Sequence, residues 1–170
     1  MLITNGMKKW ALRLCLIIFI MRWGYAQTPV DVQLKMEHIL IMFPEAKSLV
    51  VPEDENKWVK VLDGEGNILG GVTLTSPYAD HITGHDGPVP LLIGADVSGK
   101  INGIIILPNS ETPDFIDHLQ KKGFVSSFTG LSLKEVVNSE YDTVSGATLS
   151  SGAIIKTIKH RLKMMENSSP

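Results

Sequence analysis

The sequence predicts an α+β domain: a curved, mostly antiparallel sheet built from two similar hairpins, with helices packed against it, one of them at the C-terminus. Two observations carry this prediction. Apolar runs of strand length occur in pairs around turn residues, and apolar residues recur at helical spacing near both ends of the chain. A length of 170 residues suits one domain, and a single cysteine excludes a disulfide framework, a thiolate metal cluster and CxxCH haem attachment.

Residues 1–26 have the pattern of a secretory signal peptide. Three basic residues precede an uninterrupted apolar run from Leu14 to Met21, and small residues allow a cut before Gln27. The run is eight residues long, whereas a bilayer span takes about 20. We therefore expect an exported protein, periplasmic or at the extracytoplasmic face of a membrane. The pattern leaves open whether the leader is cleaved or kept as an anchor.

The charge balance changes when the leader is set aside. The chain has 16 basic and 18 acidic residues, and the leader holds four of the basic ones and no acid, which leaves twelve against 18 and a net charge of −6. Such a domain lacks the basic face that nucleic acid requires, so we expect no nucleic-acid partner. A protein partner would more readily offer a basic docking face.

Residues 30–166 are predicted to form a single domain that begins with a helix, because apolar residues recur at helical spacing from Val30 to Phe43 and Pro44 ends the segment. Two hairpin patterns follow, each with Asp and Gly in its turn. They join Lys57–Leu62 to Ile68–Thr75, and Leu91–Ala95 to Ile101–Leu107.

The two hairpins share the pattern D-x-x-G-x-I-x-G-x-x-x-L, which begins at Asp63 and again 33 residues later at Asp96. One recurrence is too few for a solenoid, which needs at least about three stacked units. We therefore expect two equivalent hairpins that face one core.

The remaining segments are assigned from their turn and helix signals. A loop rich in Gly, Pro and His, Pro77–Pro90, separates the hairpins. Pro113 suits the first turn of a short helix that runs to Lys122, and we expect a strand at Phe124–Phe128. An apolar stripe from Ile154 to Met165 predicts a final helix, with the basic residues mostly off the stripe. The tail 167–170 is expected to fray.

The chemistry concentrates just before the final helix, in the segment Asp142–Ser150. Gly146 and Ala147 allow a ligand to approach the backbone, and Thr148 and Ser150 place hydroxyls at the unsatisfied amides of a first helical turn. Such a helix end favours an anion by roughly 0.3–1 kcal/mol when exposed. The alternative is that Ser150 simply caps a surface helix.

These residues resemble the flavinylation motif, Asp-x-x-Ser-Gly-Ala-Thr-x-Ser, of the FMN-binding domain family. That family occurs in G subunits of Rnf complexes, in the C subunit of the sodium-translocating NADH:quinone reductase and in nitrous-oxide-reductase regulators. Further segments stand in the family's order, among them Gly84–Pro88 and Glu111–Pro113. The resemblance covers most of the chain after the leader.

The resemblance implies that a separate Mg-dependent flavin transferase joins Thr148 to FMN through a phosphoester. It also implies that Glu111 and Thr112 lie near the isoalloxazine ring. The other cofactor-site residues would shape the turn around the phosphate: Asp142, Ser145, Gly146, Ala147 and Ser150. The chain departs from the pattern of many members at His85, where an aromatic residue is common, and at Asp114–Ile116, where Gly-Leu-Gly is common.

The function implied is extracytoplasmic electron transfer by covalent FMN, with a membrane-bound redox protein as the donor. No nucleophile and base arrangement indicates an independent enzyme, so we predict no catalytic residue. A non-redox sensor or regulatory module of a membrane protein is the main alternative, and a chain of an exported flavoenzyme is a third. His81 and His85 with nearby aspartates raise a metal site as another alternative, but such loops commonly carry solvated His and Asp, and we expect no metal.

Overall fold

The computed structural model describes residues 34–170, and Lys35–Pro170 form one compact unit. The predicted signal peptide lies outside the described residues, so its boundary stays a prediction, as do the limits of the domain. No helix in residues 34–170 is long and apolar enough to cross a membrane.

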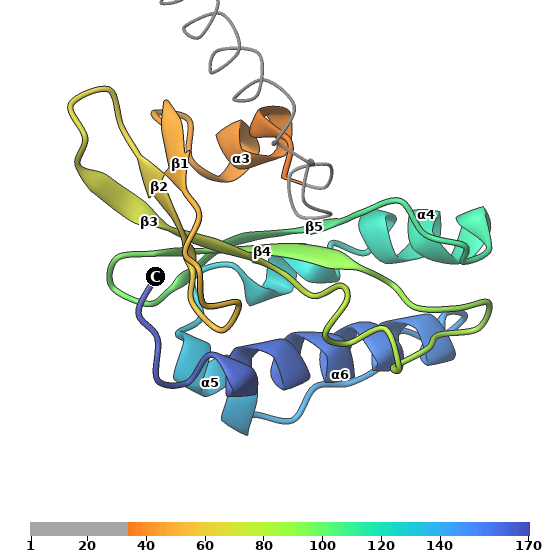
Figure 1. Ribbon diagram of the computed structural model, residues 1–170. Helices are drawn as coiled ribbons and strands as arrows, with labels where there is room; N and C mark the ends of the chain where they lie inside the picture. Colours follow the sequence, from red (N-terminus) through yellow and green to blue (C-terminus); the bar gives the residue numbers. More distant parts are fainter. Residues whose placement is uncertain (1–33) are drawn as a thin grey trace, which may run out of the picture. The chain divides into compact units, whose positions relative to one another are not determined.

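An open five-stranded antiparallel sheet forms the centre of the domain (Figure 1). Its strands follow the chain order, β1-β2-β3-β4-β5, and both predicted hairpins are present. The α+β prediction is therefore confirmed. The strands are β1 (Ser48–Val50), β2 (Val59–Leu62), β3 (Ile68–Leu74), β4 (Leu91–Asp96) and β5 (Ile101–Ile106). The short edge strand β1 was not predicted, because three residues are too few to show a period.

The turns of the two hairpins have the same construction. In each, the aspartate, Asp63 or Asp96, accepts hydrogen bonds at Oδ1 from the backbone N–H groups two and four residues later, at 2.8 Å in the first turn and at 2.8 and 3.0 Å in the second. Gly66 and Gly99 take φ values of +88° and +77°, which glycine adopts without steric cost. The sequence repeat therefore corresponds to a structural repeat of the turn.

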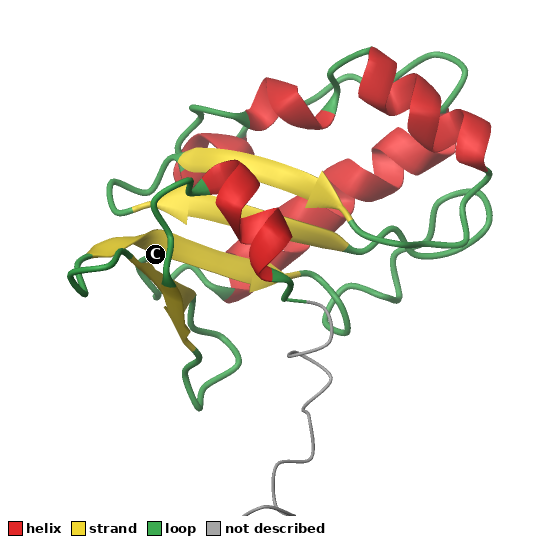
Figure 2. Ribbon diagram, turned by 90° about the horizontal axis from the view of Figure 1, so that it is seen from above, coloured by secondary structure: helices red, strands yellow, loops and turns green. Residues whose placement is uncertain are grey.

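Helix α3 (Met36–Met42) covers one face of the sheet, and Figure 2 shows it lying across the strands. It packs closely because Gly94 and Gly103, partners in β4 and β5, have no side chains beneath it. An added Cβ would come within 2.7 Å of Met42 Sδ at Gly94 and within 2.9 Å of Met42 Cγ at Gly103. The sequence predicted a helix from Val30 to Phe43, and its start at residues 30–33 lies outside the described residues; within them the helix begins at Met36.

The opposite face carries the main core and the long helix α6 (Thr148–Met164). Leu91 and Ile93 of β4 are fully buried on this face with Ile154 and Ile158 of α6. Three shorter elements pack against the same core. They are α4 (Pro113–Lys121), the 3₁₀ helix η1 (Val125–Phe128) and α5 (Leu133–Asn138), and Figure 1 shows α5 beside α6. Pro113 occupies the first turn of α4, as predicted.

The strand predicted at Phe124–Phe128 is wrong, since η1 occupies these residues. Phe124 and Phe128 are buried with their rings 5.8 Å apart, edge to face. Both rings belong to the main core, and the segment forms no strand of the sheet. Helix α5 was not predicted, although Ser132 and Glu135 form a capping box at its start.

Arg161 departs from the expected exposed basic face of the last helix, because it is buried between β3 and two loops. Its Nε donates to Thr73 Oγ1 at 2.9 Å and its Nη2 to the Glu55 carbonyl at 2.6 Å. The guanidinium lies 3.8 Å from the centroid of the Tyr78 ring. Burial lowers the pKa of Arg161, yet arginine keeps its charge in proteins. The residue therefore ties three segments to α6.

Candidate functional site

The predicted motif forms a turn that leads into the N-terminus of α6. Gly146 has a φ of +86°, a conformation that favours glycine. Ala147 occupies the N-cap and provides no side-chain hydrogen bond to the helix. Thr148 is the first helical residue and is exposed. Within residues 34–170 its hydroxyl makes no hydrogen bond, so an exposed free hydroxyl stands at an uncapped helix end.

Ser151 holds the turn from the helix side. Its Oγ donates to the Ala147 carbonyl at 2.8 Å and accepts from the Val144 N–H at 2.9 Å. The Ala147 N–H in turn donates to the Val144 carbonyl at 3.0 Å. Ser151 is fully buried, so these bonds are shielded from water. The hydroxyl therefore fixes the approach of the chain to Thr148.

His118 of α4 holds the same turn from outside. Its Nε2 lies 3.0 Å from the carbonyl oxygen of Ser145. Because a carbonyl only accepts, this contact requires the tautomer or charge state with a proton on Nε2. The sequence did not indicate His118, because a lone histidine on a short helix carries no local signal of this contact.

Glu111 is the central residue of the site, since it joins two segments distant in sequence. Its side chain is only 4% exposed. Oε2 accepts from the Ser150 hydroxyl at 2.7 Å, and Oε1 accepts from the Asp86 N–H at 3.0 Å. Ser150 is buried and its hydroxyl donates to Glu111. Ser150 therefore does not cap a surface helix, and the alternative interpretation is wrong. A Cβ at Gly84 would overlap the Glu111 carboxylate, so the glycine permits the loop to sit this close.

Asp86 extends the network to the surface. Thr112 Oγ1 donates to its Oδ2 at 2.6 Å, and His85 Nδ1 lies 3.0 Å from its Oδ1. The hydrogen bond from Thr112 and then that from His85 hold the pKa of Asp86 below its usual 3.8. The His85 ring also meets Phe115 edge to face, with centroids 5.3 Å apart. His85 and the segment Asp114–Ile116, the two places where the chain departs from the family pattern, are therefore in contact.

Of the eight predicted site residues, the structure joins Glu111 directly to Ser150 and Thr112 to the same loop through Asp86. Asp142 is exposed and makes no side-chain hydrogen bond in the described part of the chain. His81, weighed as a metal ligand, instead meets His160 edge to face at 4.8 Å. Residues 34–170 contain no group of three metal-ligating side chains.

These features fit a phosphate-bearing group. The uncapped amides of the first turn of α6 point outward with the positive end of the helix dipole, and a free hydroxyl stands beside them. A glycine-containing turn at a helix N-terminus is an arrangement that can hold a phosphate.

Comparison with known proteins specifies the class further. Residues 84–163 match the family model of the FMN-binding domain, which confirms the resemblance predicted from the motif. The matched segment includes every predicted site residue.

The chain is also similar to proteins named as the G subunit of an ion-translocating oxidoreductase complex. It is 28% identical to the protein of Haemophilus influenzae (strain PittEE) over 140 residues, covering 72% of this chain and 64% of that protein. For Stutzerimonas stutzeri the identity is 28%, over 59% of this chain and 48% of the relative. For the protein of Shewanella amazonensis the identity is 30%, over 46% of this chain and 42% of the relative. Residues 84–163 are therefore similar to the FMN-binding domain, and the chain spans less than two thirds of the length of these relatives.

Proposed function

We propose that this protein carries FMN in covalent linkage to Thr148 and passes electrons between a membrane-bound redox protein and an acceptor on the extracytoplasmic side. The observation that supports it most directly is the free, exposed hydroxyl at the uncapped N-terminus of α6. Ser151, His118 and Glu111 hold the surrounding turn, so Thr148 has a defined place on the surface.

In the attachment step, a Mg-dependent flavin transferase would use as donor a flavin nucleotide in which the FMN phosphate is part of a phosphoanhydride. Thr148 Oγ1 forms a P–O bond to the FMN phosphorus, the anhydride P–O bond breaks, and the nucleoside monophosphate leaves while the threonine proton is released. The protein gains the mass of FMN less one water. Bound FMN would supply one- or two-electron transfer. Ser145 and Gly146 are exposed, so a transferase can reach the turn from outside.

The choice of a covalent bond follows from the proposed compartment. A reversibly bound cofactor occupies its site only as far as its free concentration exceeds Kd. Outside the cytoplasm free FMN would be scarce, whereas a tethered cofactor is not lost by dilution. Relatives named as parts of an ion-translocating oxidoreductase complex support a membrane-bound redox donor, and the acidic domain suits a donor with a basic docking face.

The attachment is tested by intact-mass analysis of the full chain after coexpression with a flavin transferase. We expect an adduct of FMN less one water on the wild type, its retention in Thr148→Ser, and its loss in Thr148→Ala. Ser139→Ala, at an exposed serine outside the motif, is the matched control and should be modified fully. A wild type that stays unmodified under these conditions would contradict the proposal.

Electron transfer and export are tested separately. Rapid-mixing oxidation of the reduced, modified protein by candidate periplasmic acceptors distinguishes a carrier from a sensor, since a carrier must be reoxidised by a partner. Fusion of a reporter active only outside the cytoplasm to residue 170 tests the export predicted from residues 1–26. A reporter that remains inactive would overturn the location alone.

A further inference from the structure

The segments that meet at the N-terminal end of α6 contain acids but no Lys or Arg. They are the loop 83–88, the segment 110–118 that leads into α4, and residues 142–152, which form the turn and the first residues of α6. Their acids are Asp86, Glu111, Asp114, Asp117 and Asp142. Their only side chains that can become positive are His85 and His118. Because reduction adds negative charge to a flavin, a flavin at this end has no fixed cation in these segments to offset that charge.

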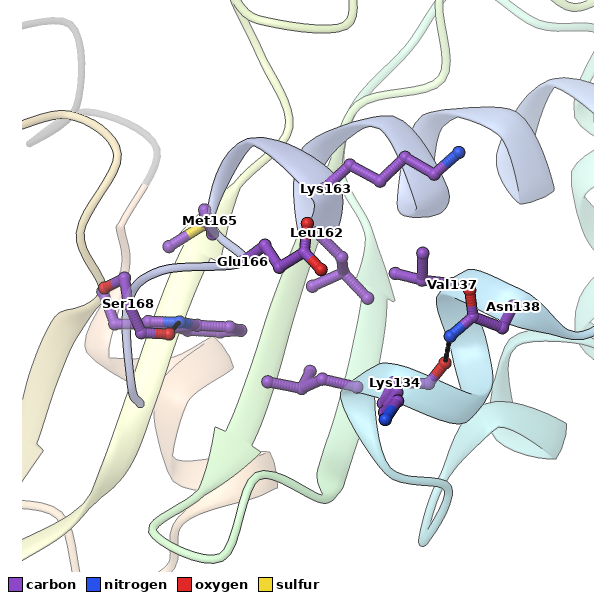
Figure 3. Close-up of a pocket in the computed structure, with 10 residues that line it drawn as sticks. Lys134, Val137, Asn138, Leu162, Lys163, Met165, Glu166 and Ser168 are labelled. Atoms are coloured by element: carbon purple, nitrogen blue, oxygen red, sulfur yellow. Dashed lines mark hydrogen bonds between the residues drawn. The ribbon is translucent and has the colours of Figure 1, made fainter.

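The opposite end of α6 differs in charge. Figure 3 shows the pocket at that end, between α5, the last turn of α6 and the C-terminal tail. The charged residues that line it are Lys134, Lys163 and Glu166. The tail 167–170, which we expected to fray, is bonded to the residue before β2, because Trp58 Nε1 donates to the Ser168 carbonyl at 3.2 Å. Lysines thus accompany the C-terminal end of the helix, whereas the segments around Thr148 contain none.

His85 lies on the same surface as Thr148. Its neighbour Gly84 packs on the first turn of α6, since a Cβ added there would lie 3.3 Å from Ser150 Cα. Helix α4 spans the two places, because one of its aromatic rings meets the His85 ring and its His118 contacts the turn before Thr148. The ribityl chain of FMN separates its phosphate from its ring. We therefore expect the ring of FMN attached at Thr148 to lie within reach of His85.

The orientation of His85 is fixed by its loop. A hydrogen bond from the Gly84 N–H to the Gly87 carbonyl, at 2.7 Å, closes the loop. His85 Nδ1 lies 3.0 Å from Asp86 Oδ1, and an ionised carboxylate only accepts, so Nδ1 carries the proton of this contact. Nε2 makes no hydrogen bond within residues 34–170, and the side chain is 52% exposed. Nε2 is therefore the nitrogen that can exchange a proton with water.

His85 is better placed than His118 to take up a proton. His118 uses its Nε2 in the contact with the Ser145 carbonyl. At His85, the adjacent Asp86 carboxylate stabilises the imidazolium, because an opposite charge within about 4–6 Å favours the charged form. The charged and titratable groups on the elements around His85 are Asp86 on its own loop, Glu111 before α4, Asp114, Asp117 and His118 on α4, and Asp142 in the turn before α6. All but His118 are acids, so these surroundings favour a protonated His85.

We propose that His85 takes up a proton when the flavin is reduced and releases it when the flavin is reoxidised; this inference rests on the proposed attachment of FMN at Thr148. Two electrons from the donor and one proton enter the flavin, which leaves it with one added negative charge. A second proton, from water, binds His85 Nε2 and offsets that charge. On reoxidation the two electrons pass to the acceptor and both protons return to water. His85 thus couples the oxidation state of the flavin to pH.

The first test follows the histidine resonances of the flavinylated full chain by NMR, with isotope-labelled imidazole rings. The pH titration of each resonance is recorded on the oxidised protein and again after reduction with dithionite. We expect the His85 resonance to titrate at a higher pH in the reduced protein, whereas that of His160, further along α6, should titrate equally in both. In Thr148→Ala, which has no attachment site, dithionite should leave the His85 titration unchanged. An equal titration of His85 in the two states of the modified wild type would overturn the inference.

The second test measures how the reduction potential of the flavin depends on pH. We expect a steeper dependence in the wild type than in His85→Gln or in His85→Phe, which keeps an aromatic ring beside Phe115 but has no exchangeable proton. His81→Gln, at an exposed histidine outside the three segments, is the matched control and should equal the wild type. Equal slopes for the wild type and His85→Gln would also rule the inference out.

Intact-mass analysis before each measurement separates this inference from the proposed function. A wild type that carries the FMN adduct and fails either test overturns the role of His85 alone. A wild type that is never modified contradicts the flavin attachment and, with it, the role of His85.

Discussion

The two ends of helix α6 are built by different interactions. At the N-terminal end, hydrogen bonds from Ser150, Ser151 and neighbouring loops hold a turn and leave one hydroxyl free. At the C-terminal end, apolar side chains around Trp58 pack against α5 and the tail. Hydrogen bonds are directional, whereas apolar packing is not. The comparison indicates that directional bonds fix the geometry of the turn at the polar end, whereas packing stabilises the apolar end.

The largest expected effect comes from a substitution that disrupts the apolar packing at the C-terminal end of α6. Trp58→Ala removes a fully buried side chain and should lower the free energy of unfolding by about 3–5 kcal/mol, the range for large aromatic residues in cores. Urea denaturation followed by circular dichroism measures the change. Under conditions where the variant is folded, its flavinylation rate should equal that of the wild type. A specific loss of flavinylation would show that the two ends are coupled.

The next largest effect is expected when the hydrogen bonds of Glu111 near the N-terminal end of α6 are removed. Glu111→Ala leaves the buried Ser150 hydroxyl and the partly buried Asp86 N–H without their acceptor, which should cost about 2–4 kcal/mol. Unlike the tryptophan variant, it should also slow flavinylation in the folded protein. Urea denaturation and time-resolved intact-mass analysis measure the two effects. Glu111→Gln keeps one acceptor oxygen and is the matched variant, for which both losses should be smaller.

A smaller effect is expected from a substitution that affects only the turn before Thr148. His118→Ala removes the contact with the Ser145 carbonyl and should cost about 0.5–1.5 kcal/mol of stability, the net value of one such hydrogen bond. Its flavinylation rate should fall through a higher KM for the protein substrate of the transferase, because the turn is then less ordered. His160→Ala, outside the motif, is the control. Equal rates in the two variants would exclude a positioning role for His118.

The smallest effect concerns pH. The hydrogen bonds to Asp86 lower its pKa from the usual 3.8, so the ionised form is favoured in the folded protein. The stability that this gives is complete above pH 3.8 and is lost as the pH falls through the lowered native pKa. Thr112→Val should move the pKa of Asp86 back toward 3.8, as measured by carboxyl NMR titration. An unchanged pKa would assign the shift to His85 instead.

The sequence predicted well those features that depend on neighbouring residues. The paired turns at Asp63 and Asp96 follow from an aspartate and a glycine at fixed spacing, and α4 begins where Pro113 suits a first turn. Elements without a strong local period were missed or wrong. β1 is too short to show a period, and η1 has aromatic residues that are equally typical of a buried strand.

The motif around Thr148 and its helix end were accessible from sequence, because a glycine turn, small residues and hydroxyls occur together in one short segment. The contacts that hold that segment were decided only by the tertiary structure. Glu111 and Ser150 are 39 residues apart, and His118 reaches Ser145 across 27 residues. A side-chain hydrogen bond extends about 3 Å, so local spacing carries no information about such partners. They meet because the packing of the sheet and α6 brings their backbones together.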